Sequence, residues 1–265
     1  SKIDQLLTGT SGIVSDGSGA NAVGRPDPAT WTASRSRQLR WQSNQLLTNQ
    51  TSLSSNFKTG GLQHALSAGL ELIYEKQTSR GRTGAGAMAP ADLYDPKVND
   101  PITGQDIRYT GQINEGNTKT MALYAFDSIE FSPQWQLNGG LRWDRYRSAN
   151  DNTTAPNATT GAQTRTQLRS SGSLLSAKLG LVFKPVEYGS IYAGISTSQQ
   201  PPGGSNFALS ATEGNINHSS MDPSKATNLE VGTKWDILDR RLLLTSALFQ
   251  TTVRNDLGTV DNVTG

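Results

Sequence analysis

The stretch SKATNLEVGTKWDILDRRLLLTSALFQTTVRND, residues 224–256, decides the fold class. Apolar or β-branched side chains alternate with polar or small ones on both sides of the segment Asp236–Arg240. A period of two places successive side chains on opposite faces of a sheet, and aspartates favour turns. The stretch therefore predicts a β-hairpin with Leu229 and Val231 on one face and Glu230 on the other.

The composition is compatible with both a soluble β-protein and a membrane barrel. The chain has 265 residues, of which 34% are hydrophobic and 17% charged, with a formal charge of +2 and a mean hydropathy of −0.50. This charge does not indicate a nucleic-acid partner, and the lack of cysteine excludes disulfides and thiolate metal sites. No run reaches the roughly 18 apolar residues of a transmembrane helix. Barrel strands show lipid only every second residue, so hydropathy does not decide between the two classes.

The rest of the chain repeats the hairpin pattern. About nine strands and no helix are expected. Short turns are predicted at Lys58, Ser132, Lys184 and Asp236. Long polar connections are expected at 12–30, 78–116, 149–169 and 199–222, and the last three alternate with the short turns.

This alternation of connections favours a membrane barrel over a soluble β-sandwich. Up-and-down strands with short turns on one rim and long loops on the other are typical of outer-membrane barrels. Several strand patterns exceed the roughly 9–11 residues that a tilted strand needs to cross a bilayer, so the excess is expected to project on the long-loop side. A sandwich has shorter strands. Mid-strand polar residues such as Glu71 and Arg142 fit a water-filled lumen.

Aromatic residues lie near both ends of the expected strands. Trp135, Tyr188 and Trp235 are beside short turns, and Trp143 and Tyr146 lie toward the other ends. Membrane barrels carry aromatic girdles at both interfaces. The pattern therefore predicts two girdles, although aromatics are common near any strand end.

Four stretches resemble a known family. They are WTASRSRQLRWQSNQLLTNQTSLSSNFKTGGLQHALSAGLELIYEK (31–76), MALYAFDSIEFSPQWQLNGGLRWDRY (121–146), SIYAGISTSQQPPGG (190–204) and NLEVGTKWDILDRRLLLTSALFQTTVRND (228–256). They resemble the barrel of TonB-dependent siderophore receptors and are most similar to the catecholate-type receptors. The most specific pieces are the Asn-Gln-Thr strand with its Thr-Gly-Gly turn and the segment Leu-Glu-Val-Gly-Thr-Lys-Trp.

The resemblance implies an all-β fold, an antiparallel up-and-down transmembrane β-barrel of about 22 strands that is filled by an N-terminal plug. Residues 1–265 are then expected to be a partial barrel, with the plug and the C-terminal strands outside this sequence. In that frame Asp236–Arg240 is a periplasmic turn. Trp235 would face lipid together with Leu229 and Val231. Lys234 would face the plug together with Glu230.

The resemblance also implies a transporter rather than an enzyme, located in the Gram-negative outer membrane. It would import ferric siderophore of catecholate type into the periplasm, driven by the TonB–ExbB–ExbD energy-transducing complex through the plug. Outer-membrane lipid and lipopolysaccharide are the other expected partners, and nucleic acid is not expected. Iron arrives already chelated, so no resident cofactor or metal site is expected. The alternatives are another cargo, such as a hydroxamate siderophore or haem, and a passive porin or adhesin.

An anionic ferric catecholate needs cationic and aromatic groups at the barrel mouth. The candidates are five residues of the connection 78–116 and two at the start of the connection 199–222: Arg80, Arg82, Tyr94, Arg108, Tyr109, Gln199 and Gln200. The competing interpretation of any one of them is a solvated loop residue. Many family members have an Asn-Pro-like step where this chain has Gln-Gln-Pro-Pro, a difference that bears on ligand specificity.

Other chemistry finds little support in the sequence. His64 and His218 are isolated, because neither has a second metal-ligating residue at the spacing of a metal site. They are expected to be ordinary strand or loop histidines. The oxygen-rich segment at 95–100 lacks the spacing and the glutamate of an EF-hand. Nucleophile elbows and phosphate-binding glycine loops do not occur. No catalytic residue is therefore expected.

Overall fold

The structure, a computed structural model, describes residues 1–14, 31–97, 99–204, 208–239 and 241–256. These residues form a ten-stranded sheet. The part of the chain that is described contains no helix long and apolar enough to cross a membrane. The strands are β1 (Lys2–Val14), β2 (Thr32–Thr59), β3 (Leu62–Thr83), β4 (Ala91–Asp92), β5 (Arg108–Ser132), β6 (Trp135–Thr153), β7 (Arg165–Val186), β8 (Gly189–Gln200), β9 (Ser224–Ile237) and β10 (Leu242–Arg254).

The strand order is that of an up-and-down sheet. Along the sheet it is β1-β2-β3-β5-β6-β7-β8-β9-β10, and the two-residue β4 pairs with β2. Neighbours run antiparallel in the pairs β1–β2, β7–β8, β8–β9 and β9–β10. The all-β class, the up-and-down order and the nine long strands predicted from the sequence are confirmed.

The chain divides into two compact units. The smaller comprises residues 1–44, 77–115 and 151–166, and the larger comprises residues 45–76, 116–150 and 167–265. The candidate residues of the connection 78–116 therefore belong to the smaller unit. The two glutamines of the connection 199–222 belong to the larger unit.

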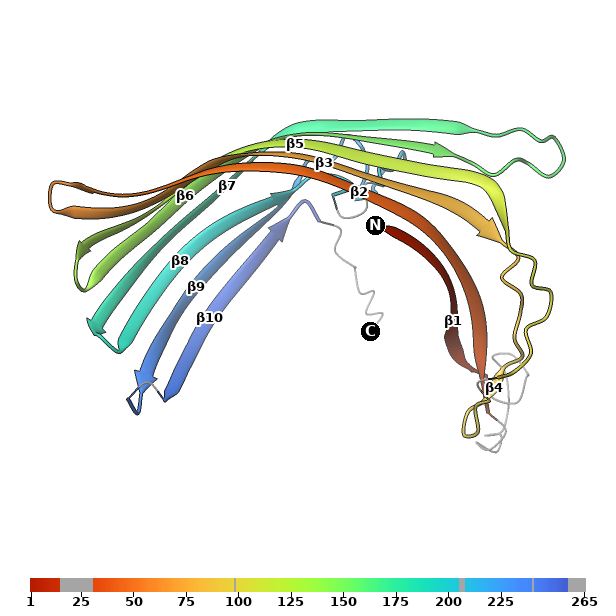
Figure 1. Cartoon of the computed structure of the whole chain (residues 1–265), viewed down its shortest axis with the longest axis horizontal. Helices are drawn as coiled ribbons and strands as arrows, with labels where there is room; N and C mark the ends of the chain where they lie inside the picture. The colour runs from red at the N-terminus through yellow and green to blue at the C-terminus, as the bar shows by residue number, and fades with distance from the viewer. Residues whose placement is uncertain (15–30, 98, 205–207, 240, 257–265) are drawn as a thin grey trace, which may run out of the picture. The chain divides into compact units, whose positions relative to one another are not determined.

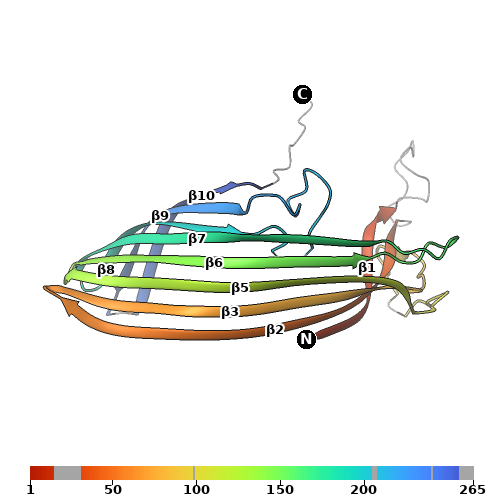
Figure 2. The ribbon, with the colours of Figure 1, turned by 90° about the horizontal axis from the view of Figure 1, so that it is seen from above.

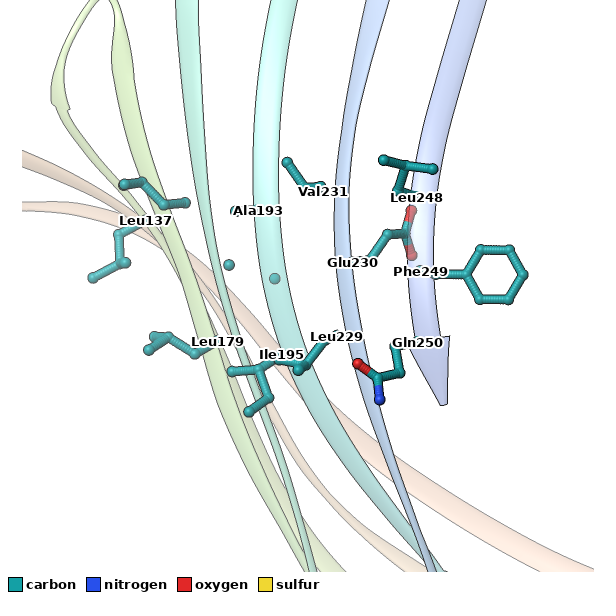
Figure 3. Close-up of a pocket in the computed structure, with 13 residues that line it drawn as sticks. Leu137, Leu179, Ala193, Ile195, Leu229, Glu230, Val231, Leu248, Phe249 and Gln250 are labelled. Atoms are coloured by element: carbon teal, nitrogen blue, oxygen red, sulfur yellow. The ribbon is translucent and has the colours of Figure 1, made fainter. Parts of the chain in front are cut away.

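The C-terminal hairpin of the larger unit has the predicted two-sided character. β8, β9 and β10 lie side by side (Figure 1). The register places Leu179, Ile195 and Leu229 in one row across β7, β8 and β9, as the close-up shows (Figure 3). The side chains of Leu179 and Leu229 are 53% and 48% exposed. An apolar face thus lies open on this part of the sheet.

Several strands are longer than the sequence pattern indicated. β3 runs to Thr83 and β5 begins at Arg108, so the connection predicted at 78–116 shortens to 84–107. Likewise β6 ends at Thr153 and β7 begins at Arg165, which shortens the connection predicted at 149–169. These strand ends are polar on both faces, so they lack the apolar alternation that marks a strand in sequence, whereas their threonines and neighbouring strands favour extension.

The boundaries of one predicted loop and one predicted turn also differ in the structure. Gly12–Val14, expected in a loop, belong to β1, and the rest of that expected loop, residues 15–30, lies outside the described residues. Asp236 and Ile237 belong to β9 rather than to the turn. Leu238 and Asp239 carry the reversal, with φ values of 54° each. Left-handed backbone of this kind suits a tight hairpin.

Aromatic rings meet near the short turns, the two girdles stay a prediction, and one of the aromatic residues does not fit them. The ring centroid of Trp135 is 4.5 Å from that of Phe183 and 6.4 Å from that of Phe131. Tyr146 is only 3% exposed, so it does not belong to a surface girdle. It lies three residues after Trp143 in the same strand and therefore on the opposite face.

Candidate functional site

Three of the candidate residues form one cation–aromatic cluster in the smaller unit. The Arg80 guanidinium carbon lies 5.1 Å from the ring centroid of Trp41 and 5.9 Å from that of Tyr109. The Arg82 guanidinium carbon lies 5.6 Å from the Tyr109 ring. The two rings meet edge to face, with centroids 6.5 Å apart and planes at 82°. We call Trp41, Arg80, Arg82 and Tyr109 the cation–aromatic cluster.

Strand geometry explains why these side chains meet. Arg80 and Arg82 are two residues apart in β3 and so share a face. β3 lies between β2, which carries Trp41, and β5, which carries Tyr109. The cluster thus comes from three adjacent strands rather than from a flexible connection, and strand positions hold a site more precisely than loop positions do.

The charge of the cluster is only partly neutralised. Arg82 pairs with Asp4 of β1, and its Nε atom is buried without a hydrogen-bond partner. Arg80 makes no ion pair within the described part of the chain, and the amine of Lys2 approaches the Trp41 ring to 5.7 Å. Tyr109 is 53% exposed. A cationic and aromatic surface of this kind can bind a planar or catecholate anion through charge and ring contacts.

The structure does not bring Arg108 and Tyr94 into the cluster. Arg108 forms an exposed ion pair with Asp106, at 3.2 Å, so its charge is locally offset. Tyr94 is 66% exposed, and its backbone N–H donates to the Asp92 carboxylate at 2.8 Å. A second backbone donor, from Asp95, reaches the same carboxylate, and these two hydrogen bonds lower the pKa of Asp92. Tyr94 therefore belongs to an Asx-type turn.

The two glutamines contact neighbouring residues at the end of β8. The Gln199 Nε2 atom donates to the backbone carbonyl of Leu175 at 2.8 Å. The side chain of Gln200 lies against Gly204, where an added Cβ would meet its Cγ at 2.8 Å. Gln199 and Gln200 thus have a structural role at this strand end, and their part in ligand binding stays a prediction.

One contact set that the sequence analysis missed ties the connection 84–107 to β2. Arg35 donates from Nε to the carbonyl of Ala89 at 2.7 Å and from a terminal nitrogen to that of Lys97 at 3.1 Å. It also pairs with Asp100. The only signal of such a contact in the sequence is that Arg35 and Arg37 occupy alternate positions of a strand-like stretch. The connection is therefore held in place rather than merely solvated.

Mid-strand polar residues of the larger unit form two networks. Arg142 contacts the carboxylates of Glu71 at 2.7 Å and Asp144 at 2.9 Å. The Tyr192 hydroxyl donates to Glu230 at 2.6 Å. The Lys234 amine lies 5.7 Å from the Tyr192 ring. The sequence marked such residues as polar in mid-strand but did not indicate their partners.

Comparison with known proteins now identifies the fold family. The sequence model described as "TonB dependent receptor-like, beta-barrel" matches residues 6–265. The chain belongs to the TonB-dependent receptor family. Receptors of this family are outer-membrane proteins, and this membership decides against the passive porin and adhesin alternatives.

Individual relatives place the receptor more closely. It is 36% identical to the catecholate siderophore receptor Fiu of Escherichia coli K12 over 99% of this chain. The crystal structure of the ferric-catecholate import receptor Fiu in its closed form matches with a TM-score of 0.82 and 34% identity, over 98% of this chain and 38% of that one. The ferric citrate transporter FecA, at 19% identity and a TM-score of 0.60, shares the fold.

The chain spans about a third of the length of Fiu, since the match covers 36% of that relative. A relative with a different cargo also matches. The metal-pseudopaline receptor CntO of Pseudomonas aeruginosa is 28% identical over 84% of this chain and 29% of its own length.

The two histidines differ in their surroundings. The described residues contain no group of three or more His, Cys, Asp or Glu side chains able to hold a metal ion. His64, expected to be an ordinary strand or loop histidine, has a partner in the folded chain: its Nδ1 atom lies 2.7 Å from an Asp127 carboxylate oxygen, and its ring stacks on Phe57. The partner comes from β5, far away in sequence, so spacing along the chain did not show it. His218 contacts the hydroxyl of Ser220 at 2.8 Å.

Proposed function

We propose that the full-length receptor imports a ferric siderophore of catecholate type across the outer membrane into the periplasm. The observation that carries this proposal is the match to the ferric-catecholate import receptor Fiu over nearly the whole chain in both sequence and structure. Import of this kind makes and breaks no covalent bond in the cargo. The receptor is thus a transporter and not an enzyme.

The cation–aromatic cluster supports a catecholate cargo. Ferric catecholates are anionic and carry aromatic rings, so they suit arginines for charge-assisted contacts and Trp or Tyr for ring contacts. Arg80 is the leading contact residue because it lies over two rings and has no carboxylate partner among the described residues. Arg82 has a supporting part, since Asp4 already holds it.

The remaining partners follow from the same proposal. Energy for uptake comes from the TonB–ExbB–ExbD complex, acting through the plug that fills the barrel in this family. Iron enters as a chelate, so it is cargo and not a resident cofactor. The polar networks around Arg142 and Glu230 are then surfaces for the plug, while the face with Leu229 meets lipid and lipopolysaccharide.

A second cargo class has one observation in its favour. CntO, which is described as a metal-pseudopaline receptor, matches most of this chain. A cargo that is not a catecholate is therefore the alternative, and hydroxamate siderophores and haem belong in the same comparison. The fold does not decide between these cargoes, since the ferric citrate transporter FecA shares it.

Uptake of radiolabelled iron by a strain lacking the receptor gene tests the proposal. Wild-type full-length receptor should restore uptake of an iron–catecholate chelate but not of a hydroxamate, haem or pseudopaline-type chelate. Arg80→Gln should raise the half-saturation concentration about tenfold, the loss of one charge-assisted contact of about 1.5 kcal/mol. Arg108→Gln removes the same charge outside the cluster and should leave uptake unchanged. Catecholate uptake that is the same with and without the gene would refute the proposal.

A further inference from the structure

The connection 84–107 is attached to the two strands that carry most of the cation–aromatic cluster. Thr83, the last residue of β3, directly follows Arg82, and Tyr109 is the second residue of β5. β2, β3 and β5 are neighbours in the sheet, as Figure 2 shows. The two ends of the connection thus continue into the strand ends that bear Arg82 and Tyr109. A movement of the connection therefore displaces these strand ends.

Close backbone contacts join the two arms of the connection near those strand ends. Ala87 and Thr103 exchange two backbone hydrogen bonds, at 2.9 and 3.0 Å, and the Asp106 N–H donates to the Gly84 carbonyl at 2.9 Å. Gly84 has a φ of 78°, and a Cβ atom there would overlap the Asp106 carbonyl oxygen. Glycine permits both the backbone conformation and the close approach. The two arms are therefore held together, and a constraint on one of them also restrains the other.

The far part of the connection is anchored on β2 by Arg35. Its guanidinium group donates to the carbonyls of Ala89 and Lys97, at 2.7 and 3.1 Å, and pairs with Asp100. The side chain of Arg35 is only 7% exposed. The short strand β4, which follows Ala89 in the sequence, pairs with the start of β2. A buried arginine with three acceptors in one connection fixes that connection to its strand.

A second arginine of β2 holds the connection closer to β3. The Nε atom of Arg37 donates to the carbonyl of Ala85 at 3.0 Å, and a terminal nitrogen of its guanidinium lies 3.7 Å from the Met88 sulfur. The hydroxyl of Thr8 in β1, which is paired with Arg37 in the register, lies 3.8 Å from the same sulfur. The connection is thus tied to β1 and β2 along much of its length.

The anchor lies on the same face of β2 as the cluster. The register between β1 and β2 is continuous from Ser43 to Arg35, so no bulge interrupts the alternation of side chains. Arg35 and Trp41 are separated by an even number of residues and so share a face. At about 3.4 Å per residue, they lie about 20 Å apart along the strand. An effect of Arg35 on the cluster must therefore pass through the connection.

We propose that Arg35 is a positioning residue of the cargo site. By anchoring the connection 84–107 on β2, it holds the start of β5 so that the Tyr109 ring stays against the two arginines of the cluster. Tyr109 depends on this anchor because it is the second residue of its strand and is 53% exposed. Arg35 itself does not contact the cargo. This inference rests on the proposed uptake of an anionic chelate by the cluster.

Uptake of a radiolabelled iron–catecholate chelate by cells that carry the full-length receptor tests the proposal. With rates normalised to the amount of receptor, Arg35→Gln should raise the half-saturation concentration about fivefold, because the ring loses its fixed position against the guanidinium groups. The maximal uptake rate should stay unchanged, since the energy-driven step does not use the anchor. Arg35→Lys, which keeps a positive charge for Asp100, should recover most of the lost affinity.

A background without the ring shows whether Arg35 acts through the cluster. In Tyr109→Leu, the further substitution Arg35→Gln should leave the half-saturation concentration unchanged, because the side chain that Arg35 positions is already gone. The matched control is Arg165→Gln, which removes an exposed arginine of the same unit whose ion pair with Asp151 spans 3.4 Å. It should leave the half-saturation concentration within about twofold of wild type.

Hydrogen exchange on the purified full-length receptor measures the connection without any cargo. The amides of Ala87 and Thr103 bond to each other's carbonyls across the two arms. Both should exchange on the order of tenfold faster in Arg35→Gln than in wild type, because the freed connection opens more often. Arg165→Gln should exchange at the wild-type rate at both positions.

Three results would overturn the proposal. Unchanged exchange in Arg35→Gln would mean that Arg35 does not anchor the connection. Faster exchange with a wild-type half-saturation concentration would mean that the anchor has only a structural role. An equal loss of affinity with and without the Tyr109 ring would mean that Arg35 acts independently of the cluster.

Failure of the proposed cargo gives a different result. The wild-type receptor would then import a hydroxamate chelate and not the iron–catecholate chelate, while the exchange rates would still report the anchor. The half-saturation concentrations of the same variants, measured with the hydroxamate chelate, would then decide whether Arg35 positions the site.

Discussion

The two faces of β7–β10 differ in what holds their side chains. On one face Leu179, Ile195 and Leu229 line up across three strands and remain exposed to whatever surrounds the protein. On the other face Tyr192 hydrogen-bonds to Glu230, and Lys234 lies over the Tyr192 ring. Both faces belong to the same backbone ladder. The first depends on an apolar surrounding medium, whereas the second satisfies its polar groups internally.

This difference separates stabilisation of the sheet by the surrounding medium from stabilisation by contacts between its own side chains. An exposed row of apolar side chains is unfavourable in water and favourable against hydrocarbon, by about 25 cal/mol per Å² of apolar surface removed from water. On the polar face the Tyr192 hydroxyl already donates to Glu230, so a change of medium alters the free energy of this pair less. The faces should therefore respond differently to the same substitution.

A charge placed on the apolar face should give the largest effect. Leu229→Arg introduces a charged side chain into the middle of that face, which costs about 2–4 kcal/mol near the centre of a bilayer. Asn228→Arg makes the same addition one residue earlier, on the polar face, and should cost less than about 1 kcal/mol. Urea unfolding of the full-length receptor in phospholipid vesicles measures both. Equal destabilisation by the two variants would break the assignment of the faces.

Removing Arg142, which lies on the same polar face of the sheet in the neighbouring strand β6, should have a smaller effect. Arg142→Gln leaves Glu71 and Asp144, whose side chains are only 19% and 12% exposed, without their shared partner. An unpaired and partly buried charged group costs about 1–3 kcal/mol, so a loss of about 2 kcal/mol is expected.

The triple variant Glu71→Gln/Arg142→Gln/Asp144→Asn sharpens this test. It removes all three charges while keeping polar side chains of similar size, and it should recover most of the lost stability. The same unfolding experiment provides the comparison. If the single variant is as stable as wild type, the network contributes nothing and the polar face is merely solvated.

The sequence predicted the faces well where only one of them is apolar. In β9 the alternation of Leu229 and Val231 with Glu230 was sufficient. In β10 it was not, because Leu243 and Phe249 lie on one face while Leu244 and Leu248 lie on the other. There the register with β9 decides, since it pairs Phe249 with Glu230 and Leu248 with Val231. Register is a long-range property, so the alternation of a single strand does not contain it.

The candidate site shows the same limit. Arg80, Arg82 and Tyr109 were expected in a loop because their neighbours are polar, yet they lie in strands and meet Trp41 from a third strand. Charge and aromatic content indicated the kind of site. Which of the candidates meet depends on strand order and strand length, and neither Arg108 nor Tyr94 joins them.

The smallest expected effect is the difference in stability between alanine substitutions at two glycines of the polar face. A Cβ atom added at Gly232 would lie 2.5 Å from the Tyr192 hydroxyl oxygen and 2.8 Å from the Ser246 carbonyl oxygen, so the tyrosine must shift and its bond to Glu230 must weaken. At Gly194, in the neighbouring strand, the nearest atom is 3.5 Å away. Overpacking at such a contact costs about 1 kcal/mol.

Gly232→Ala should therefore destabilise the receptor by about 1 kcal/mol, while Gly194→Ala should be neutral or slightly stabilising, because alanine restricts the unfolded chain. Tyr192→Phe in the Gly232→Ala background separates the two causes. If the cost comes from the displaced hydroxyl, alanine at 232 should cost less once the hydroxyl is gone, and the two substitutions should be less than additive. Strict additivity in urea unfolding would mean that the cost comes from the Tyr192 ring carbon at 2.6 Å or the Ser246 carbonyl oxygen at 2.8 Å rather than from the hydroxyl.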